Sequence, residues 1–535
     1  MGAVALEKDL CALVDYAARA GLVDWSDRLW AYNAALEAVG VAGPGPDASW
    51  VLAENVNKNA SAGVDADAPL DLEATLARLA EASVEAGRAE DTASGRDRAA
   101  MRMMGVLTPR PSQVAARFDE LCREQDPRAA TSWFYRLCCD AGYVRRAAIA
   151  RNIAWNTPTH WGDLQITINL SKPEKDPRDI AAAGQARDAG ERYPACQLCI
   201  ENEGYPGRGA AAAGGAHPAR QNLRIVPVKL DGERYGLQYS PYAYFNEHCI
   251  VMSAHHRPMH IDRASLTCLF DFVDLLPHYF IGSNADLPIV GGSILSHDHF
   301  QGGDHEFPVM RAKVTERFSL GGFPDVEACV LQWPLSVLRL RSGRREDLLE
   351  ACVHVIDAWH DWSDEAAGVR AHSADGTPHN TVTPVIRRVD EAGHVGGGRY
   401  EAYLALRCNV TSEEHPLGVF HPHAQWHHIK KENIGLIEVM GLAILPPRLV
   451  DELAAVRAHL LADDLDALES DPLCASHAPW AREVAAAHPE LSEENAQTIL
   501  RDETGQVFGH VLEDAGVFKW NDDGRAALDR FLATL

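Results

Sequence analysis

Two histidines and a glutamine alternate along one short stretch of this chain. His297, His299 and Gln301 occupy every second position in the segment GGSILSHDHFQGG, and glycines flank them on both sides. Successive side chains of an extended chain point to opposite faces, so these three would share one face at the end of a strand. Two imidazoles and an amide in line among glycines predict a binding or catalytic site.

His299 suits chemistry at phosphorus. A histidine can form a covalent intermediate when its ring is neutral and a hydrogen bond to the other ring nitrogen fixes the tautomer. The neighbouring glycines would let a phosphate approach, and backbone N–H groups would cradle its oxygens. Gln301 has the reach to donate to a phosphate oxygen. Because an amide does not titrate, it would orient charge without delivering a proton.

The composition is that of a globular protein and argues against two classes of function. The chain has 535 residues, of which 46% are hydrophobic and 24% charged, and a formal net charge of −26. A broad nucleic-acid surface would need a basic face. No apolar run approaches the roughly 18 residues of a membrane span, and the N-terminus does not read as a secretory signal. We therefore expect a cytoplasmic protein with mostly reduced cysteines and no nucleic-acid or membrane partner.

Hydrophobic spacing predicts an α+β fold in four parts. Residues 1–160 carry apolar stripes at helical spacing and predict an N-terminal helical domain. Residues 161–330 and 331–447 each combine strands, a helix and a histidine string, which predicts two antiparallel-sheet units in tandem. Residues 448–535 are expected to form a helical C-terminal region.

The first sheet unit is expected to contain strands on both sides of a helix. Its predicted elements are strands at 164–170, 222–229 and within 238–252, a helix at 262–279, and a strand that carries His297 and His299. A turn at Asp231–Gly232 separates two of these strands and indicates antiparallel pairing. The order is typical of an α+β unit.

A second histidine string has the spacing of the first. His421, His423 and Gln425 follow strands predicted at 383–388 and 400–410, with a helix at 348–362 before them. Duplication of one sheet unit is the simplest explanation, although the two units align poorly outside the strings. A helix is predicted from Leu449 onward.

Cys196 and Cys199 form a CxxC pair, for which a metal site, a redox pair or two plain thiols are possible. A redox CxxC usually opens a helix. Here ENEGYPGR and an alanine/glycine-rich loop follow instead. The surroundings therefore favour a metal site over a redox role, and plain thiols stay the alternative.

Longer blocks of the chain resemble a known family. INLSKPEKDP, CQLCIENEGYPGR, QYSPYAYFNEHCIV, PHNTVTPVIRR and HHIKKENIGLIEVMGLAILP, together with the first histidine string, resemble the type 2 branch of the galactose-1-phosphate uridylyltransferases. That family lies in the transferase branch of the histidine-triad superfamily. The blocks run from about residue 166 to residue 447. The resemblance implies that the two central units have histidine-triad-like folds.

The activity implied by the resemblance is a double displacement in galactose metabolism. His299 would attack the α-phosphorus of UDP-glucose and expel glucose 1-phosphate, and galactose 1-phosphate would then take the uridylyl group to form UDP-galactose. Gln301 would hold the transferred phosphate. Hydrolases of the superfamily have a third histidine at that position, so the glutamine is consistent with an intermediate that waits for a sugar phosphate. Such catalysis consists mainly of positioning and charge stabilisation.

The resemblance also implies a structural zinc ion. The type 1 branch carries a zinc site whose matching positions are Cys196, Cys199, His256 and His297. Two sulfurs and two imidazoles suit tetrahedral zinc. Alternatively, the two histidines only support the loop.

A second metal site is implied in the second unit. His421 and His423 correspond to two ligands of a type 1 metal site, and His379 could be a third. Alternatively, these histidines brace the second sheet or contact substrate across a dimer interface. The type 1 relatives also imply a homodimer.

Further candidates for binding substrate lie in the family-like blocks. They are Lys172, Arg220, Arg224, Asn284, Asp286, Gly291, Gly292, Ser293 and Arg387. Each cation could instead pair with an acidic residue. Two other functions stay open, namely transfer from a different nucleotide sugar and nucleotide binding without turnover.

Overall fold

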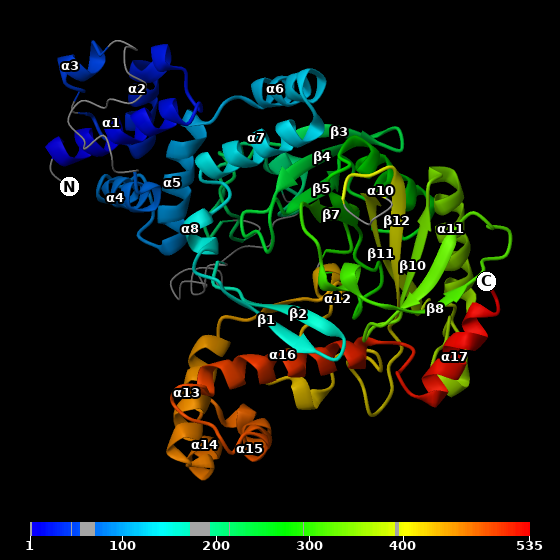
Figure 1. The fold of residues 1–535 in the computed structure, drawn as a ribbon. Coiled ribbons are helices and arrows are strands. Elements are labelled where there is room, and N and C mark those ends of the chain that lie inside the picture. Colours follow the sequence, from blue (N-terminus) through cyan, green and yellow to red (C-terminus); the bar gives the residue numbers. More distant parts are fainter. Residues whose placement is uncertain are drawn as a thin grey trace.

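The computed structural model describes residues 3–43, 45–53, 70–171, 193–212, 215–292, 294–390 and 395–535. Two of the predicted substrate-binding residues, Lys172 and Ser293, lie outside these ranges. The predicted α+β class is confirmed: helices form the N-terminal part, a large antiparallel sheet the centre and further helices the C-terminal part (Figure 1). Within the described ranges, no helix has the length and apolar character needed to cross a bilayer.

Eight helices, some of them a single turn, make up the described N-terminal part. They are α1 (Ala3–Arg19), α2 (Arg28–Val39), α3 (Ala48–Val51), α4 (Leu72–Glu85), α5 (Ala93–Leu107), α6 (Pro111–Glu124), α7 (Pro127–Asp140) and α8 (Arg146–Ile149). Local sequence explains their starts. The Asp71 and Asp126 side chains accept from backbone N–H groups of α4 and α7, and Pro127 occupies the first turn of α7, where no amide hydrogen is needed.

A ten-stranded sheet forms the centre of the molecule (Figure 1). Its strands are β3 (Val226–Leu230), β4 (Glu233–Tyr239), β5 (Cys249–Ser253), β6 (Phe280–Gly282), β7 (His299–Gly303), β8 (Val314–Phe318), β9 (Glu327–Leu331), β10 (Val337–Ser342), β11 (Asn380–Val389) and β12 (Arg399–Cys408). The order is β3-β4-β5-β7-β6-β11-β12-β10-β9-β8, with antiparallel pairing throughout. The predicted turn at Asp231–Gly232 joins β3 to β4.

The two halves of this sheet repeat one topology. Each half has three consecutive strands, a helix, and then two strands placed in reversed order, which gives β3-β4-β5-β7-β6 and β8-β9-β10-β12-β11. The helices are α10 (Arg263–Leu275) and α11 (Arg345–Asp361), close to the predicted ranges. The halves meet where β6 pairs with β11, so the two expected sheet units form one continuous sheet.

Alternation along the strands divides the core between the two faces of the sheet. In β12, Ala402, Leu404 and Leu406 join the core that contains α10 and α11, whereas Tyr403 and Ala405 face the opposite core. This period of two is the expected pattern for a sheet covered on both faces. The opposite core also contains Leu164 and Ile166, which belong to a separate three-stranded sheet, and apolar residues of the C-terminal helices.

A three-stranded sheet joins distant parts of the chain. It contains β1 (Ile153–Thr159), β2 (Gly162–Ile168) and β13 (Leu442–Leu445); β2 lies antiparallel to β1 and parallel to β13. The helices of the C-terminal part are α12 (Leu436–Val439), α13 (Leu449–Ala462), α14 (Leu465–Ser470), α15 (Ala478–Ala487), α16 (Ala496–Ala515) and α17 (Asp522–Leu532). Of these, α16 packs along β1 (Figure 1).

Two expectations about strands are wrong in detail. The range 238–252 holds the end of β4 and most of β5, because the chain turns between them at Glu247, whose φ is +52°. The first histidine string lies at the start of a strand and not at its end, since β7 begins at His299 and His297 precedes it. The apolar run before the string forms no strand within the described residues.

The second histidine string does not occupy the place of the first. By topology the counterpart of β7 is β12, and His421, His423 and Gln425 come after β12, in a loop with a short 3-10 turn at Ala424–Trp426. The duplicated topology therefore does not extend to the strings. Their shared spacing reflects no shared position in the two half-sheets.

Candidate active site

His299 begins β7 and lies opposite Met252 of β5. Only 5% of the residue is exposed. Its Nδ1–H donates to the carbonyl oxygen of His297 at 2.8 Å. Because a carbonyl oxygen can only accept, the ring proton resides on Nδ1 and a lone pair is left on Nε2. Burial lowers the pKa of His299, so the ring is neutral near pH 7. A neutral imidazole of fixed tautomer is a competent nucleophile.

Gln301 follows on the same face of β7 and pairs with Ile250 and Gly282 in the flanking strands. Its Oε1 accepts from Nε2 of His248 at 3.1 Å. Within the described ranges, the N–H donors of the Gln301 amide have no protein acceptor. The amide is thus held at its oxygen and keeps its donors for another group.

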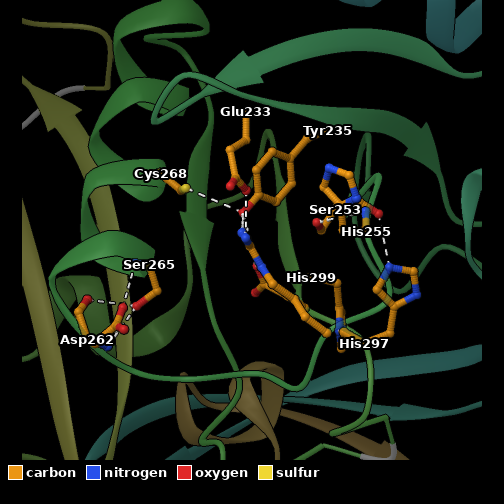
Figure 2. Close-up of polar contacts among 11 residues, drawn as sticks. Glu233, Tyr235, Ser253, His255, Asp262, Ser265, Cys268, His297 and His299 are labelled. Carbon is orange, nitrogen blue, oxygen red and sulfur yellow. Dashed lines mark hydrogen bonds and ion pairs between the residues drawn. The ribbon is translucent and has the colours of Figure 1, made fainter.

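Asp298, the residue between the two histidines, is held by a network of hydrogen bonds. The Tyr235 hydroxyl donates to the Asp298 carboxylate at 2.9 Å, and Arg257 donates both to that hydroxyl at 2.8 Å and to the carboxylate at 3.2 Å. The backbone N–H of Asp298 donates to the carbonyl of Arg257, and the carbonyl of Asp298 accepts from Ser253. Figure 2 shows Tyr235 close to the histidine-bearing segment. This network holds the carbonyl that accepts from His299.

His297 points away from His299 and toward the CxxC pair. Its Nε2–H donates to the carbonyl oxygen of Ser253 at 2.9 Å (Figure 2), and its Nδ1 lies 3.3 Å from Sγ of Cys196. The ligand atoms of Cys196, His256 and His297 all lie within 4.8 Å of one another. A metal-binding histidine typically donates its other ring N–H to a carbonyl or carboxylate, as His297 does.

Cys199 joins the same cluster. Its Sγ and the ligand atoms of Glu201 and His256 also lie within 4.8 Å of one another. Hydrogen bonding from Cys199 lowers the pKa of Cys196, which favours the thiolate that metals bind. The four predicted metal ligands thus fall into two neighbouring groups that share His256, and the second group adds Glu201, which was not predicted.

The second predicted metal group is not assembled. His379 contacts Ser373 at 2.6 Å and Asn409 at 2.7 Å, His421 contacts Asn433 at 3.2 Å, and His423 contacts Asp514 at 3.3 Å. Among the described residues, the ligand atoms of these histidines do not converge in one group. Each histidine instead supports its own loop, so the geometry of the described residues does not favour the second metal site, which stays a prediction.

The loop before β7 is shaped by close backbone approach. A Cβ on Gly291 would collide with the carbonyl oxygens of Ala285 and Leu287, and one on Gly292 would collide with Asn284. Oδ1 of Asn284 accepts from the backbone N–H of Leu436 at 2.9 Å. The Asp286 carboxylate accepts from the backbone N–H of Ile261 and from Thr381. Asn284 and Asp286 thus both hold the loop in place.

Models of two protein domains match most of this chain. The model of the galactose-1-phosphate uridyl transferase N-terminal domain matches residues 53–258, and that of the C-terminal domain matches residues 272–482. The chain belongs to the galactose-1-phosphate uridyl transferase family. The predicted resemblance is confirmed.

Curated relatives of this transferase span nearly its whole length. A galactose-1-phosphate uridylyltransferase of Bacillus subtilis is 45% identical over 98% of this chain and 96% of its own. Those of Clostridium acetobutylicum and Halalkalibacterium halodurans are 45% and 47% identical over 88% and 86% of this chain, and over 91% and 88% of their own. A solved structure of yeast Ap4A phosphorylase matches 60% of this chain and 91% of that chain at 12% identity, with a TM-score of 0.32.

The three described arginines predicted to bind substrate differ in what they contact in this transferase. Arg224 donates to the carbonyl oxygens of Thr108, Pro109, Gln221 and Leu223. Arg387 forms a buried ion pair with Glu401 at 2.6 Å and donates to the Tyr403 hydroxyl. Both guanidinium groups are therefore used within the fold.

Arg220 is the exception. It is 93% buried, yet its side chain makes only a 3.4 Å contact with the carbonyl of Ala219 and lies over the Tyr143 ring at 5.8 Å. In the part of the chain that the structure describes, no carboxylate pairs with it. Of the three arginines, Arg220 has the most free capacity for an anion.

Three features of the transferase site were missed at the level of sequence. Glu201 lies two residues after Cys199, His248 stands directly before β5, and Asp298 separates the two histidines. Asp298 carried a usable signal, because alternation places it on the face opposite His299, where a charged group needs a partner. The partner itself, Tyr235, follows only from the pairing of β4 with β5.

Proposed function

We propose that the chain transfers a uridylyl group from UDP-glucose to galactose 1-phosphate by double displacement through His299. The observation that carries this proposal is the Nδ1–H bond of His299 to the His297 carbonyl, which leaves Nε2 as a free lone pair. The names of the curated relatives support the choice of substrates. The reaction belongs to galactose metabolism.

In the first step, the Nε2 lone pair attacks the α-phosphorus of UDP-glucose. The bond between that phosphorus and the bridging oxygen breaks, and glucose 1-phosphate leaves with the bonding electrons. The product is a uridylyl-imidazolium, whose positive charge is stabilised because Nδ1–H already donates to a carbonyl. No proton has to move in this step.

In the second step, a phosphate oxygen of galactose 1-phosphate attacks the same phosphorus. The P–N bond breaks, its electrons return to Nε2 and UDP-galactose leaves. In both steps the N–H donors of Gln301 would bind an oxygen of the transferred phosphate, where negative charge accumulates. Arg220 would supply a positive charge for a phosphate of the substrates.

The residues present fit a structural zinc ion held by Cys196, Cys199, His256 and His297. Two observations support this assignment. Sulfur and imidazole ligand atoms lie close together, and the Nε2–H of His297 donates to the carbonyl of Ser253, which leaves Nδ1 for the ion. Zinc, when bound, would fix the segment at His297 and with it the carbonyl that accepts from His299. Glu201 would lie beside the ion as an alternative ligand. The homodimer and the cytoplasmic location stay predictions.

The test is incubation with UDP-glucose alone, followed by mass spectrometry of the intact chain and its peptides at neutral to basic pH. We expect one uridylyl group on the peptide that carries His299, and release of an equal amount of glucose 1-phosphate. Addition of galactose 1-phosphate should remove the label and yield UDP-galactose.

The controls separate this function from the two alternatives. His299→Asn should bind UDP-glucose and form no adduct; full sugar-phosphate exchange by this variant would refute the nucleophile. Equal labelling from ADP-glucose or GDP-mannose would refute the preference for uridine. Binding of UDP-glucose without adduct in the unaltered protein would favour nucleotide binding without turnover.

A further inference from the structure

We propose that His248 is a positioning residue that turns the amide of Gln301 so that its N–H donors, and not its oxygen, meet the substrate phosphate. The inference rests on the proposed function and extends it to a residue outside the histidine string. His248 stands in the loop between β4 and β5, one residue before β5 begins. It touches neither reacting atom and would act through Gln301.

The placement of His248 is fixed by packing. The residue is 2% exposed, and its ring lies 4.5 Å from the ring of Phe245 and stacks on Tyr244 at 5.5 Å, centroid to centroid. Its backbone N–H donates to the carbonyl of Phe245, and its carbonyl accepts from Ser240. Ring and backbone are therefore both held, so Nε2 stays directed at Gln301.

Hydrogen bonding gives this contact a direction. Nε2 of His248 lies 3.1 Å from Oε1 of Gln301, whereas Nδ1 is buried without a partner. Burial lowers the pKa of His248 to about 4, so near pH 7 the ring is neutral and carries a single N–H proton, on either Nδ1 or Nε2. On Nε2 that proton pairs with the Gln301 oxygen. On Nδ1 it would be a buried donor without an acceptor, which costs free energy.

The orientation matters for the reaction. If the Gln301 amide were reversed, its nitrogen would face His248 and its oxygen would face the phosphate, where two acceptors repel each other. An Nε2–H at His248 excludes this reversed amide, because two N–H donors would then face each other. One buried imidazole thus selects the amide orientation that can stabilise the transferred phosphate.

The experiment compares the rate of adduct formation from UDP-glucose, in a single turnover, for variants of His248. His248→Phe keeps a ring without a donor, and we expect the rate to fall roughly tenfold to hundredfold. This is less than the roughly hundredfold to thousandfold loss on removal of a donor to a developing charge, because the Gln301 amide itself is kept. His248→Gln restores an N–H near the position of Nε2 and should recover part of the rate. His278→Phe, a change at another buried histidine that contacts Thr131, should leave the rate unchanged.

A double-mutant cycle separates positioning from a structural role. In a Gln301→Ala background, His248→Phe should cause no additional loss of rate, because no amide is left to orient. Equal losses in both backgrounds, or no loss in either, would overturn the proposal.

A second measurement does not depend on activity. Nitrogen-15 NMR of histidine-labelled protein, with the His248 signal assigned by its loss in His248→Phe, should show the proton on Nε2. A proton on Nδ1 would overturn the proposal even if uridylyl transfer is established. If the unaltered protein forms no adduct, the proposed function fails, and this tautomer still decides whether His248 orients Gln301.

Discussion

Nδ1 of His299 lies 2.8 Å from the carbonyl oxygen of His297, and the ring of that same His297 lies against Sγ of Cys196. One residue therefore connects the nucleophile to the cysteine cluster, through its backbone on one side and its side chain on the other. Disturbance of the cluster is expected to reach the nucleophile through a single peptide.

The Tyr235 hydroxyl is expected to matter more for rate than for stability. Tyr235→Phe removes the donor to Asp298 and the acceptor for Arg257, which should cost about 1 kcal/mol of unfolding free energy and slow adduct formation several-fold, because the peptide at Asp298 loosens. Chemical denaturation and single-turnover assays measure both. Tyr400→Phe removes a hydroxyl that donates to Asp274 and should leave the rate unchanged. An equal loss of rate in both variants would contradict this account.

Loss of one thiol should remove the proposed metal. We expect about one zinc ion per chain by elemental analysis, and Cys196→Ser should bring the content close to zero, since tetrahedral sites seldom retain zinc with a ligand missing. Cys11→Ser, at a half-buried thiol in α1, should retain the metal. Metal content near zero in the unaltered protein would rule out the site.

Substitution of Arg224 is expected to lower the stability of the fold, whereas substitution of Arg220 is expected to weaken the reaction with the sugar phosphates. Arg224→Met leaves four carbonyl oxygens without their donor and should lower the unfolding free energy by at least about 2 kcal/mol. Arg220→Met removes one weak contact, so it should be less destabilising, but it should lower kcat/KM for the sugar phosphates by about tenfold or more. Steady-state kinetics and urea unfolding of both variants test the contrast, which a reversed pattern would refute.

Stability should fall between about pH 6.5 and pH 4. Burial lowers the pKa to about 4 in four histidines, namely His248, His278, His305 and His428. Their unfolded forms, with pKa values of about 6.5, bind protons in this range that the folded forms do not. The unfolded state is therefore favoured as the pH decreases, and this contribution to stability is complete only above about pH 6.5.

Urea midpoints across this pH range check the prediction. His278→Gln removes one of the four titrating groups and should make the decline shallower. A midpoint that is independent of pH between about pH 7 and pH 5 would show that these rings titrate equally in both states.

Local patterns predicted much of this architecture. The alternation in β11 and β12 and the helical spacing in α10 and α11 fixed these elements within a few residues, because their apolar faces pack directly on the core. The family resemblance implied that Cys196, His256 and His297 come together, although the three positions span about a hundred residues of the chain.

Features that depend on distant partners were not predictable. β6 has three residues and takes its form from pairing with β7 and β11, and β13 lies parallel to β2 from the other end of the chain. Arg224 contacts the backbone carbonyl oxygens of Thr108 and Pro109. Every residue has such an oxygen, so the sequence does not indicate these contacts. The role of His248 likewise depends on which atom of Gln301 its ring meets.

The short pairing of β6 with β11 is the junction of the two half-sheets, and it has a consequence for separating the chain into two polypeptides. If the two half-sheets were produced as separate polypeptides, each would have an unpaired strand edge at its inner border, and such edges promote association between chains. Since the matching edges are complementary, the fragments should precipitate alone and reassemble when expressed together. The junction is thus a place where one gene could be split into two that depend on each other.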